Sequence, residues 1–327
     1  MRLLVTGGAG FIGSNFVRRA FDGTFKDFRS VIVLDKLTYS GVLANLSGLK
    51  DEAGFEFVQG DICDSRLVAE LVESVDMVVN FAAESHVDRS IENASEFVKT
   101  NVLGVQVLLD AIKSGSKSKR FLQVSTDEVY GSIDSGSWDE EFPLKPNSPY
   151  SASKAGGEFL ARSYGVTHGM DIVTTRCSNN YGPFHFPEKM IPLFITNLIQ
   201  GKKVPVYGDG RNVRDWLHVD DHCHGIYLAL IKGKPNEVYN IGGGTELSNL
   251  ELTHMILNAL GADETFIEYV QDRKGHDQRY SVNCTKIQKE LGYQPQVKFQ
   301  DGLASTIDWY RKNQDWWEPL KKRSEIA

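Results

Sequence analysis

A short glycine-rich run near the N-terminus limits the possible folds of this chain more than any other feature. Residues 7–13 read GGAGFIG, follow an apolar run at 3–6 and precede a helical pattern at 11–21. Glycines at this spacing permit a tight strand-to-helix turn and let backbone N–H groups approach a pyrophosphate. No lysine follows Gly13, which excludes an ATP-binding P-loop. The pattern predicts a dinucleotide site between the first strand and the first helix.

Short apolar runs alternate with longer helical patterns throughout the first half of the chain. Alternation of this kind is typical of an α/β fold with a doubly wound parallel sheet, of the Rossmann type. The expected strands are residues 3–6, 31–35, 55–59, 77–81, 121–125 and 172–175. The expected helices are residues 11–21, 95–113 and 149–168.

The second half is richer in loops that carry Pro and Gly, and it predicts a smaller C-terminal α/β substrate-binding lobe. Helices are expected at residues 187–200, 220–231, 248–260 and 301–313. We expect residues 1–178 with 211–240 to form the dinucleotide-binding domain, and residues 179–210 with 241–327 the substrate domain. The tail at 316–323 is expected to be a terminal flap with solvated charges.

Composition excludes several classes of function. The 327 residues are 41% hydrophobic and 24% charged, enough for a core without disulfides, and the net charge of −7 disfavours nucleic-acid binding. The opening residues are too short an apolar stretch for a signal peptide, and no later run approaches a membrane span, so we expect a cytoplasmic protein. The cysteines form no C-x-x-C pair and are expected to be reduced thiols: Cys63, Cys177, Cys223 and Cys284.

An acidic residue at the end of the second expected strand indicates which dinucleotide would bind. Asp35 is expected to accept hydrogen bonds from the adenosine ribose, and its charge would repel a 2′-phosphate, so NAD is predicted rather than NADP. The neighbouring Lys36 is the feature that argues the other way. Asp61 and Ile62, after the third strand, are expected at the adenine edge.

Tyr150 and Lys154 are four residues apart on an expected helix, which places both side chains on one face. An unperturbed phenol with a pKa of ~10 is a poor base at neutral pH. A nearby ammonium group and a nicotinium ring would favour the phenolate. We therefore expect Tyr150 to be an acidified tyrosine that serves as a base.

Three further motifs resemble the dTDP-glucose 4,6-dehydratases, within the extended short-chain dehydrogenase/reductases that modify nucleotide-activated sugars. They are STDEVYG at 125–131, AAESHVD at 82–88 and DRKGHD at 272–277, and the resemblance spans nearly the whole chain. Relatives usually carry Pro where Lys274 stands, which bears on the local loop conformation. The resemblance implies a nucleotide-sugar substrate, dTDP-glucose, and a homodimer that packs helices near 95–113 and 149–168.

A dehydratase needs acid and base groups, because removing water across C5 and C6 of a hexose breaks an unactivated C5–H bond. Oxidation at C4 acidifies that proton, so the expected order is C4 oxidation by NAD, elimination of water, and hydride return to C6. By resemblance, Tyr150 serves C4, Glu128 removes the C5 proton and Asp127 protonates the departing C6 hydroxyl. Thr126 would hydrogen-bond the C4 oxygen, and the two adjacent acids should titrate apart.

The remaining site residues are predicted by the motifs and by the charge of the expected ligands. A nucleotide diphosphate needs local cations, and arginine suits bidentate phosphate contacts. The expected cofactor residues are Gly7, Gly10, Phe11, Ile12, Gly13, Asp35, Lys36, Thr38, Asp61, Ile62, Ala82, Ala83, Ser85, Thr100, Tyr150, Lys154 and Asn180. The expected substrate residues are Ser85, Thr126, Asn179, Lys189, Met190, Pro205, Tyr207, Arg214, Asn249, Arg273, His276 and Tyr280.

Two other functions remain open at this stage. A nucleotide-sugar 4-epimerase would share the fold, but epimerases typically lack the Asp127–Glu128 pair. A non-catalytic NAD-binding module is disfavoured by the complete set of Thr126, Tyr150 and Lys154. His218, His222 and His224 suggest a metal cluster, yet a helix start explains them better, and no required metal is predicted. The choice between thymine and uracil rests on the resemblance, and the pathway that uses the product stays open.

Overall fold

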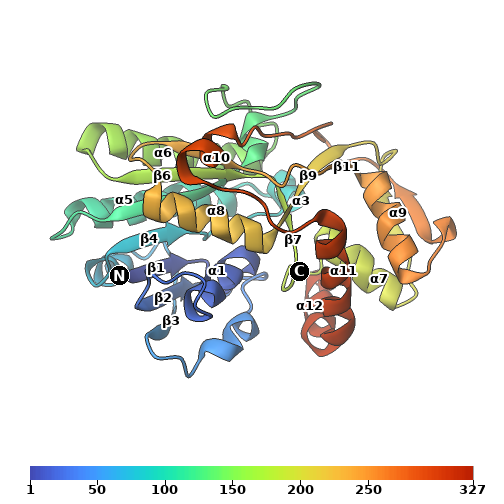
Figure 1. The fold of residues 1–327 in the computed structure, drawn as a ribbon, viewed down its shortest axis with the longest axis horizontal. Coiled ribbons are helices and arrows are strands. Elements are labelled where there is room, and N and C mark those ends of the chain that lie inside the picture. The colour runs from blue at the N-terminus through green and yellow to red at the C-terminus, as the bar shows by residue number, and fades with distance from the viewer. Residues whose placement is uncertain (327) are drawn as a thin grey trace.

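The computed structural model describes residues 1–326, which form one large parallel sheet beside a smaller lobe (Figure 1). The strands of the large sheet follow the order β10-β6-β5-β4-β1-β2-β3, and every neighbouring pair is parallel. They are β1 (Arg2–Thr6), β2 (Ser30–Asp35), β3 (Phe55–Gln59), β4 (Met77–Asn80), β5 (Arg120–Thr126), β6 (Ile172–Cys177) and β10 (Val238–Ile241). The six predicted strands are confirmed. The seventh strand, β10, lies in the second half of the chain and was not predicted from the alternation of apolar runs and helical patterns in the first half.

Two helical layers cover the two faces of the sheet because successive strand side chains point to opposite faces. Leu3 and Val5 pack with the layer of α1 (Phe11–Phe21) and α8 (Val219–Lys232). Leu4 packs with the opposite layer, which contains α2 (Ser65–Glu73), α5 (Val105–Ser114) and α6 (Pro149–His168). These strands are therefore buried on both sides, as a doubly wound fold requires.

The helix predicted over 95–113 is interrupted. It consists of α4 (Ser95–Val98), a π-helical turn η2 (Lys99–Gly104) and α5. Asn101 in that turn donates to the Glu84 carbonyl and accepts from the Glu84 N–H, both at 3.0 Å. The prediction of a helical stretch is confirmed, but its π-helical turn was not predicted, because the side-chain bonds that tie the turn to the loop after β4 leave no trace in helical periodicity.

The second lobe has its own core, built from α7 (Met190–Ile199), α9 (Asn249–Leu260), α11 (Phe299–Lys312) and α12 (Gln314–Ile326). Its strands form a three-stranded sheet and a two-stranded one: β7 (Asn179–Tyr181), β9 (Val213–His218), β11 (Glu246–Ser248), β8 (Val204–Tyr207) and β12 (Ile267–Val270). The shorter elements are η1 (Leu43–Leu49), α3 (Val87–Glu92), η3 (Asp127–Tyr130), η4 (Glu264–Phe266) and α10 (Thr285–Leu291). The predicted helices of this lobe are confirmed, although α7 begins after Lys189, which is extended.

The tail is not a solvated flap. α12 packs against the second lobe, where the Trp317 side chain is fully buried and Lys321 is buried as well. The Trp317 indole N–H donates to the Tyr310 carbonyl at 2.8 Å, and the Lys321 ammonium donates to Thr196 and Asn197. The charged sequence concealed an amphipathic helix whose lysine stem and indole rings supply the apolar face.

Within residues 1–326, no helix combines the length and apolar character needed to cross a bilayer. The four cysteines carry free thiols, as expected.

Candidate active site

A cavity of about 520 Å³ lies at the carboxyl ends of the large sheet's strands and extends to the second lobe. Parallel strands place their ligand sites at this edge, where the connections after β1 and β4 diverge to opposite sides. Every site residue predicted above lines this one cavity. The fold therefore gathers residues from Gly7 to Tyr280 around a common space, while the role of each remains a prediction.

The glycine run makes a turn that only glycine fits. Gly7 has φ +68°, and a Cβ there would lie 2.5 Å from the Ala82 nitrogen. A Cβ on Gly13 would lie 2.4 Å from the Gly7 carbonyl oxygen. Gly10 caps α1 without a side-chain hydrogen bond, so the first N–H groups of the helix remain for an anion. This cradle fits the pyrophosphate of a dinucleotide.

Asp35 ends β2 at the rim of the cradle. Its carboxylate accepts from the Ala9 N–H at 2.9 Å and the Leu37 N–H at 2.8 Å, and burial raises its pKa. The Lys36 ammonium lies 2.8 Å from an Asp61 carboxylate oxygen. Lys36, the cation next to Asp35 in the sequence, is thus already paired, which supports NAD over NADP.

Tyr150 and Lys154 lie on the face of α6 that meets β5, and both are buried. The Lys154 ammonium donates to the Val124 carbonyl at 2.6 Å, and burial lowers its pKa to about 8. Burial raises the pKa of the Tyr150 phenol well above 10, and the nearby Glu128 carboxylate adds to the rise. The expected acidified tyrosine is therefore not produced by the groups of this chain alone, because the cost of burying a phenolate exceeds their attraction for it.

Asp127 and Glu128 begin the turn η3 directly after β5. Thr126 caps that turn by accepting from the Glu128 N–H at 3.3 Å. Burial raises the pKa of both carboxyls, and the Glu128 charge raises that of Asp127 further, well above 3.8. Arg214 and Lys189 oppose the rise at Glu128. The two neighbouring carboxyls thus differ in their electrostatic surroundings, since the Glu128 charge raises the pKa of Asp127 while nearby cations act to lower that of Glu128.

Cations from separate parts of the chain line the other end of the cavity. Arg214 lies with its guanidinium 4.1 Å from the Tyr280 ring centre and donates to the Asp277 carbonyl. Lys189 donates to the Ser85 carbonyl at 3.0 Å. Arg273 lines the same cavity, so three positive groups converge where an anionic ligand would lie.

Sequence reasoning missed some lining residues, notably Asp88 and Glu188. Arg273 meets Asp88 through two contacts of 2.7 and 2.8 Å, which join α3 to the loop after β12. Glu188 is only 9% exposed at its side chain and pairs with Arg89 at 3.3 Å. Asp88 stands in the AAESHVD motif and Glu188 beside Lys189, so motif position was the available signal for each.

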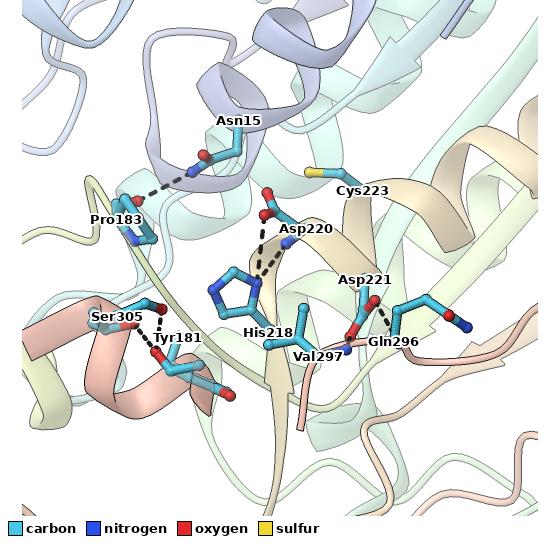
Figure 2. A network of polar contacts seen from close by, with 12 residues as sticks. Asn15, Tyr181, Pro183, His218, Asp220, Asp221, Cys223, Gln296, Val297 and Ser305 are labelled. Carbon is cyan, nitrogen blue, oxygen red and sulfur yellow. Dashed lines mark hydrogen bonds and ion pairs between the residues drawn. The ribbon is translucent and has the colours of Figure 1, made fainter. Parts of the chain in front are cut away.

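His218 and His222 make polar contacts within the fold, and Figure 2 shows His218 beside Asp220. His218 caps α8 by accepting from the Asp220 N–H at 3.3 Å, and Asp220 lies in the first turn as expected. His222 is fully buried and its Nδ1 lies 2.9 Å from the Asn180 carboxamide oxygen. Among residues 1–326, no three His, Cys, Asp or Glu side chains are grouped to hold a metal ion.

Comparison with known proteins agrees with this geometry. The family model described as GDP-mannose 4,6 dehydratase matches residues 4–306. A dTDP-glucose 4,6-dehydratase of Streptomyces niveus is 57% identical, covering 100% of this chain and 98% of the relative. DesIV, a dTDP-glucose 4,6-dehydratase from Streptomyces venezuelae solved with NAD and dTDP bound, is 58% identical with a TM-score of 0.96, covering 98% of this chain and 100% of that one.

The fold is shared with epimerases at lower identity. A UDP-glucose 4-epimerase from Thermotoga maritima is 30% identical with a TM-score of 0.88, covering 96% of this chain and 100% of that one. The sequence identity of this chain to the two dehydratases is nearly twice its identity to the epimerase, in each case over nearly the full length, and this difference separates the two groups. The chain belongs to the dTDP-glucose 4,6-dehydratases of the extended short-chain dehydrogenase/reductase family.

Proposed function

We propose that this chain is an NAD-dependent hydro-lyase that converts dTDP-glucose to dTDP-4-keto-6-deoxyglucose. The observation that carries the proposal is the Asp127–Glu128 pair, of which Asp127 is buried and Glu128 is half-buried, and which lines one cavity together with Tyr150 and the glycine cradle. An epimerase needs no acid and base for elimination, so the pair has no task in that reaction. The comparisons favour the same choice.

We assign each proton transfer of the reaction to a residue of this chain. Bound NAD supplies the acceptor for the C4 hydride and the donor that later returns it to C6. Tyr150 takes the proton of the C4 hydroxyl, with Thr126 hydrogen-bonding the same oxygen. Glu128 then removes the C5 proton, which the C4 carbonyl has acidified, and Asp127 gives its proton to the departing C6 hydroxyl. When the hydride returns to C6, the protonated Glu128 gives its proton back to C5.

The environment of each group supports these roles. The raised pKa of Asp127 keeps a proton available for the leaving group, and Arg214 and Lys189 stabilise the charged form of Glu128. Lys154 is buried beside Tyr150 on the same face of α6. Burial raises the pKa of Tyr150, and the positive nicotinium ring of bound NAD would act in the opposite direction, toward the phenolate that accepts the C4 proton.

We propose the same division of labour for the two parts of the chain. Residues 1–178 with 211–240 would hold NAD, and residues 179–210 with 241–327 would hold the nucleotide sugar. Arg214 and its strand β9 lie in the first set by residue number, although β9 pairs with β7 and β11 of the second set.

A homodimer is proposed through the helices near 95–113 and 149–168. Phe159 and Val166 on α6 are 57% and 65% exposed and lie seven residues apart, on one face of the helix. Val98 and Leu103, on the neighbouring α4 and η2, are 53% and 45% exposed. An apolar surface of this kind favours association, and light scattering should give twice the chain mass, whereas a monomer would contradict the proposal. A cytoplasmic location remains a prediction from the sequence.

The reaction itself is tested with purified protein and no added reductant. Incubation with dTDP-glucose should give a product lighter by one water, and UDP-glucose should react more slowly. A product of unchanged mass with inverted C4 would indicate an epimerase. Bound NAD without turnover would indicate a binding module.

A further inference from the structure

The C-terminal helix of the second lobe contacts the cofactor cradle of the first. The Trp316 indole N–H donates to the Asn45 carboxamide oxygen at 2.9 Å, across 271 positions of sequence. The Asn45 amide donates in turn to the Ala9 carbonyl at 2.9 Å, and the Ala9 N–H donates to Asp35 at 2.9 Å. In Figure 1, α12 in red lies beside α11, across from the blue segment after β2. We propose that Trp316 is a positioning residue that, through Asn45, slows the release of NAD.

Asn45 is the centre of this chain of hydrogen bonds. It is 3% exposed, and its carboxamide oxygen and nitrogen serve different partners, so only one orientation of the amide satisfies both. Its backbone carbonyl accepts from the Arg18 guanidinium on α1. A residue held by α1, α12 and the glycine run at once transmits the position of α12 to the cradle.

Ala9 connects the turn predicted to hold the pyrophosphate with the carboxylate predicted to bind the ribose. Its carbonyl accepts from the Val42 N–H at 3.0 Å as well as from Asn45, and its N–H holds the carboxylate predicted to bind the ribose. Ala9 itself stands within the run that cradles the pyrophosphate. A shift of Asn45 would therefore move the pyrophosphate turn and the ribose carboxylate together.

The loop between Asp35 and Asn45 needs external support. Leu37 has φ +57°, a left-handed conformation that is strained for a non-glycine residue and persists only where the surroundings hold it. α12 contacts this loop a second time, since Arg323 donates to the Thr38 carbonyl at 3.0 Å. The loop that covers the adenosine end is thus held by the second lobe at two points.

Slow release suits the proposed reaction, on which this inference rests. The hydride taken from C4 is returned to C6, so the cofactor ends each turnover in its starting form. An enzyme of this kind gains nothing from exchanging NAD between turnovers. A contact that closes the cradle from the second lobe would keep the cofactor in place while substrate and product exchange at the other end of the cavity.

The test measures NAD dissociation from the holoenzyme, by displacement of labelled NAD with excess unlabelled NAD. Trp316→Phe keeps the ring and removes only the N–H donor, and it should speed dissociation about 3- to 10-fold, the range expected for one hydrogen bond. At saturating NAD, kcat should be unchanged. Asn45→Asp removes the donor to Ala9 and should have a similar effect, and the double variant should add little, because both break one chain of bonds.

Trp317→Phe is the matched control. Its indole N–H donates to Tyr310 within the second lobe, and the side chain is fully buried, so this variant should lower the melting temperature more than Trp316→Phe. It should leave NAD dissociation unchanged, which separates positioning from general stability. Equal dissociation from Trp316→Phe and the wild type would overturn the inference alone, as would equal acceleration by Trp317→Phe. A wild type that binds no NAD would overturn the proposed function as well.

Discussion

The two ends of the active-site cavity are built in different ways. The cofactor end consists mostly of backbone at the ends of adjacent strands, as in the turn at Gly7–Gly13 and the loops after Asp35 and Asp61. The substrate end consists of side chains from separate connections, such as Lys189 before α7 and Arg273 after β12. The structure of the cofactor end follows from the regular order of strands, whereas that of the substrate end depends on contacts between distant segments. Substitutions at the two ends should therefore have separable effects.

Tyr150 lies where the two ends meet, and its loss should have the largest effect. Tyr150→Phe removes the group that takes the C4 proton, so kcat should fall by about 10³- to 10⁴-fold, and no reduced cofactor should form in a single turnover. The absorbance of reduced nicotinamide measures this step. NAD and dTDP binding should be unchanged. Normal formation of reduced cofactor in this variant would remove Tyr150 from the role of base.

Glu128 should separate oxidation from elimination. Glu128→Gln should still oxidise C4, so reduced cofactor should accumulate on adding substrate, while product formation falls by about 10²- to 10³-fold. Exchange of the C5 proton with deuterated solvent, followed by mass spectrometry, reports the step directly. Exchange at the wild-type rate would assign the C5 proton to another residue.

A substitution at Arg273 should affect the substrate end of the cavity alone. Arg273→Met should raise KM for dTDP-glucose about 10- to 100-fold, since a hydrogen bond to a charged group contributes about 1.5–3 kcal/mol. The remaining Asp88 carboxylate would add repulsion for the diphosphate. Arg279→Met is the control, because Arg279 lies nearby but pairs with Glu246 outside the cavity. A parallel loss of NAD affinity in Arg273→Met would show that the two ends are not independent.

The smallest of these predicted effects is a change in melting temperature, caused by the substitution Asp127→Asn. The pKa of the Asp127 carboxyl is raised in the folded protein, above its ordinary value of 3.8. At pH values between the ordinary and the raised pKa, the folded state therefore binds more protons than the unfolded state. The free energy of unfolding falls as the pH rises through this range. Asp127→Asn lacks this loss, so its melting temperature should exceed that of the wild type by a few degrees, increasingly so at higher pH. Its activity should fall. A melting-temperature difference that is constant with pH would contradict the raised pKa.

The sequence predicted the cofactor end well, because its signals are local. Gly13 is required by the Gly7 carbonyl six residues away, Gly7 has the positive φ of the turn itself, and Asp35 ends a strand whose apolar pattern is plain. Even here the π turn at Lys99–Gly104 was missed, since the bonds from Asn101 to Glu84 leave no periodic trace.

The second lobe was predicted less completely, because its signals are long-range. The tail was expected to be a terminal flap with solvated charges, yet Trp317 is fully buried and Trp316 donates to Asn45 in the first lobe. The pairing of Arg273 with Asp88 likewise joins residues 185 positions apart. The pKa of Tyr150 depends on similar long-range packing, because the burial that raises it cannot be predicted from the spacing of Tyr150 and Lys154.

The central claim is that one hydride leaves C4 and returns to C6 within a single turnover. Incubation with dTDP-glucose deuterated at C4, in ordinary water and without added reductant, tests it most directly. We predict that the deuterium appears in the C6 methyl group of the 4-keto product, by mass spectrometry and NMR. Product that has lost the label to solvent, or that retains it at C4, would contradict the account.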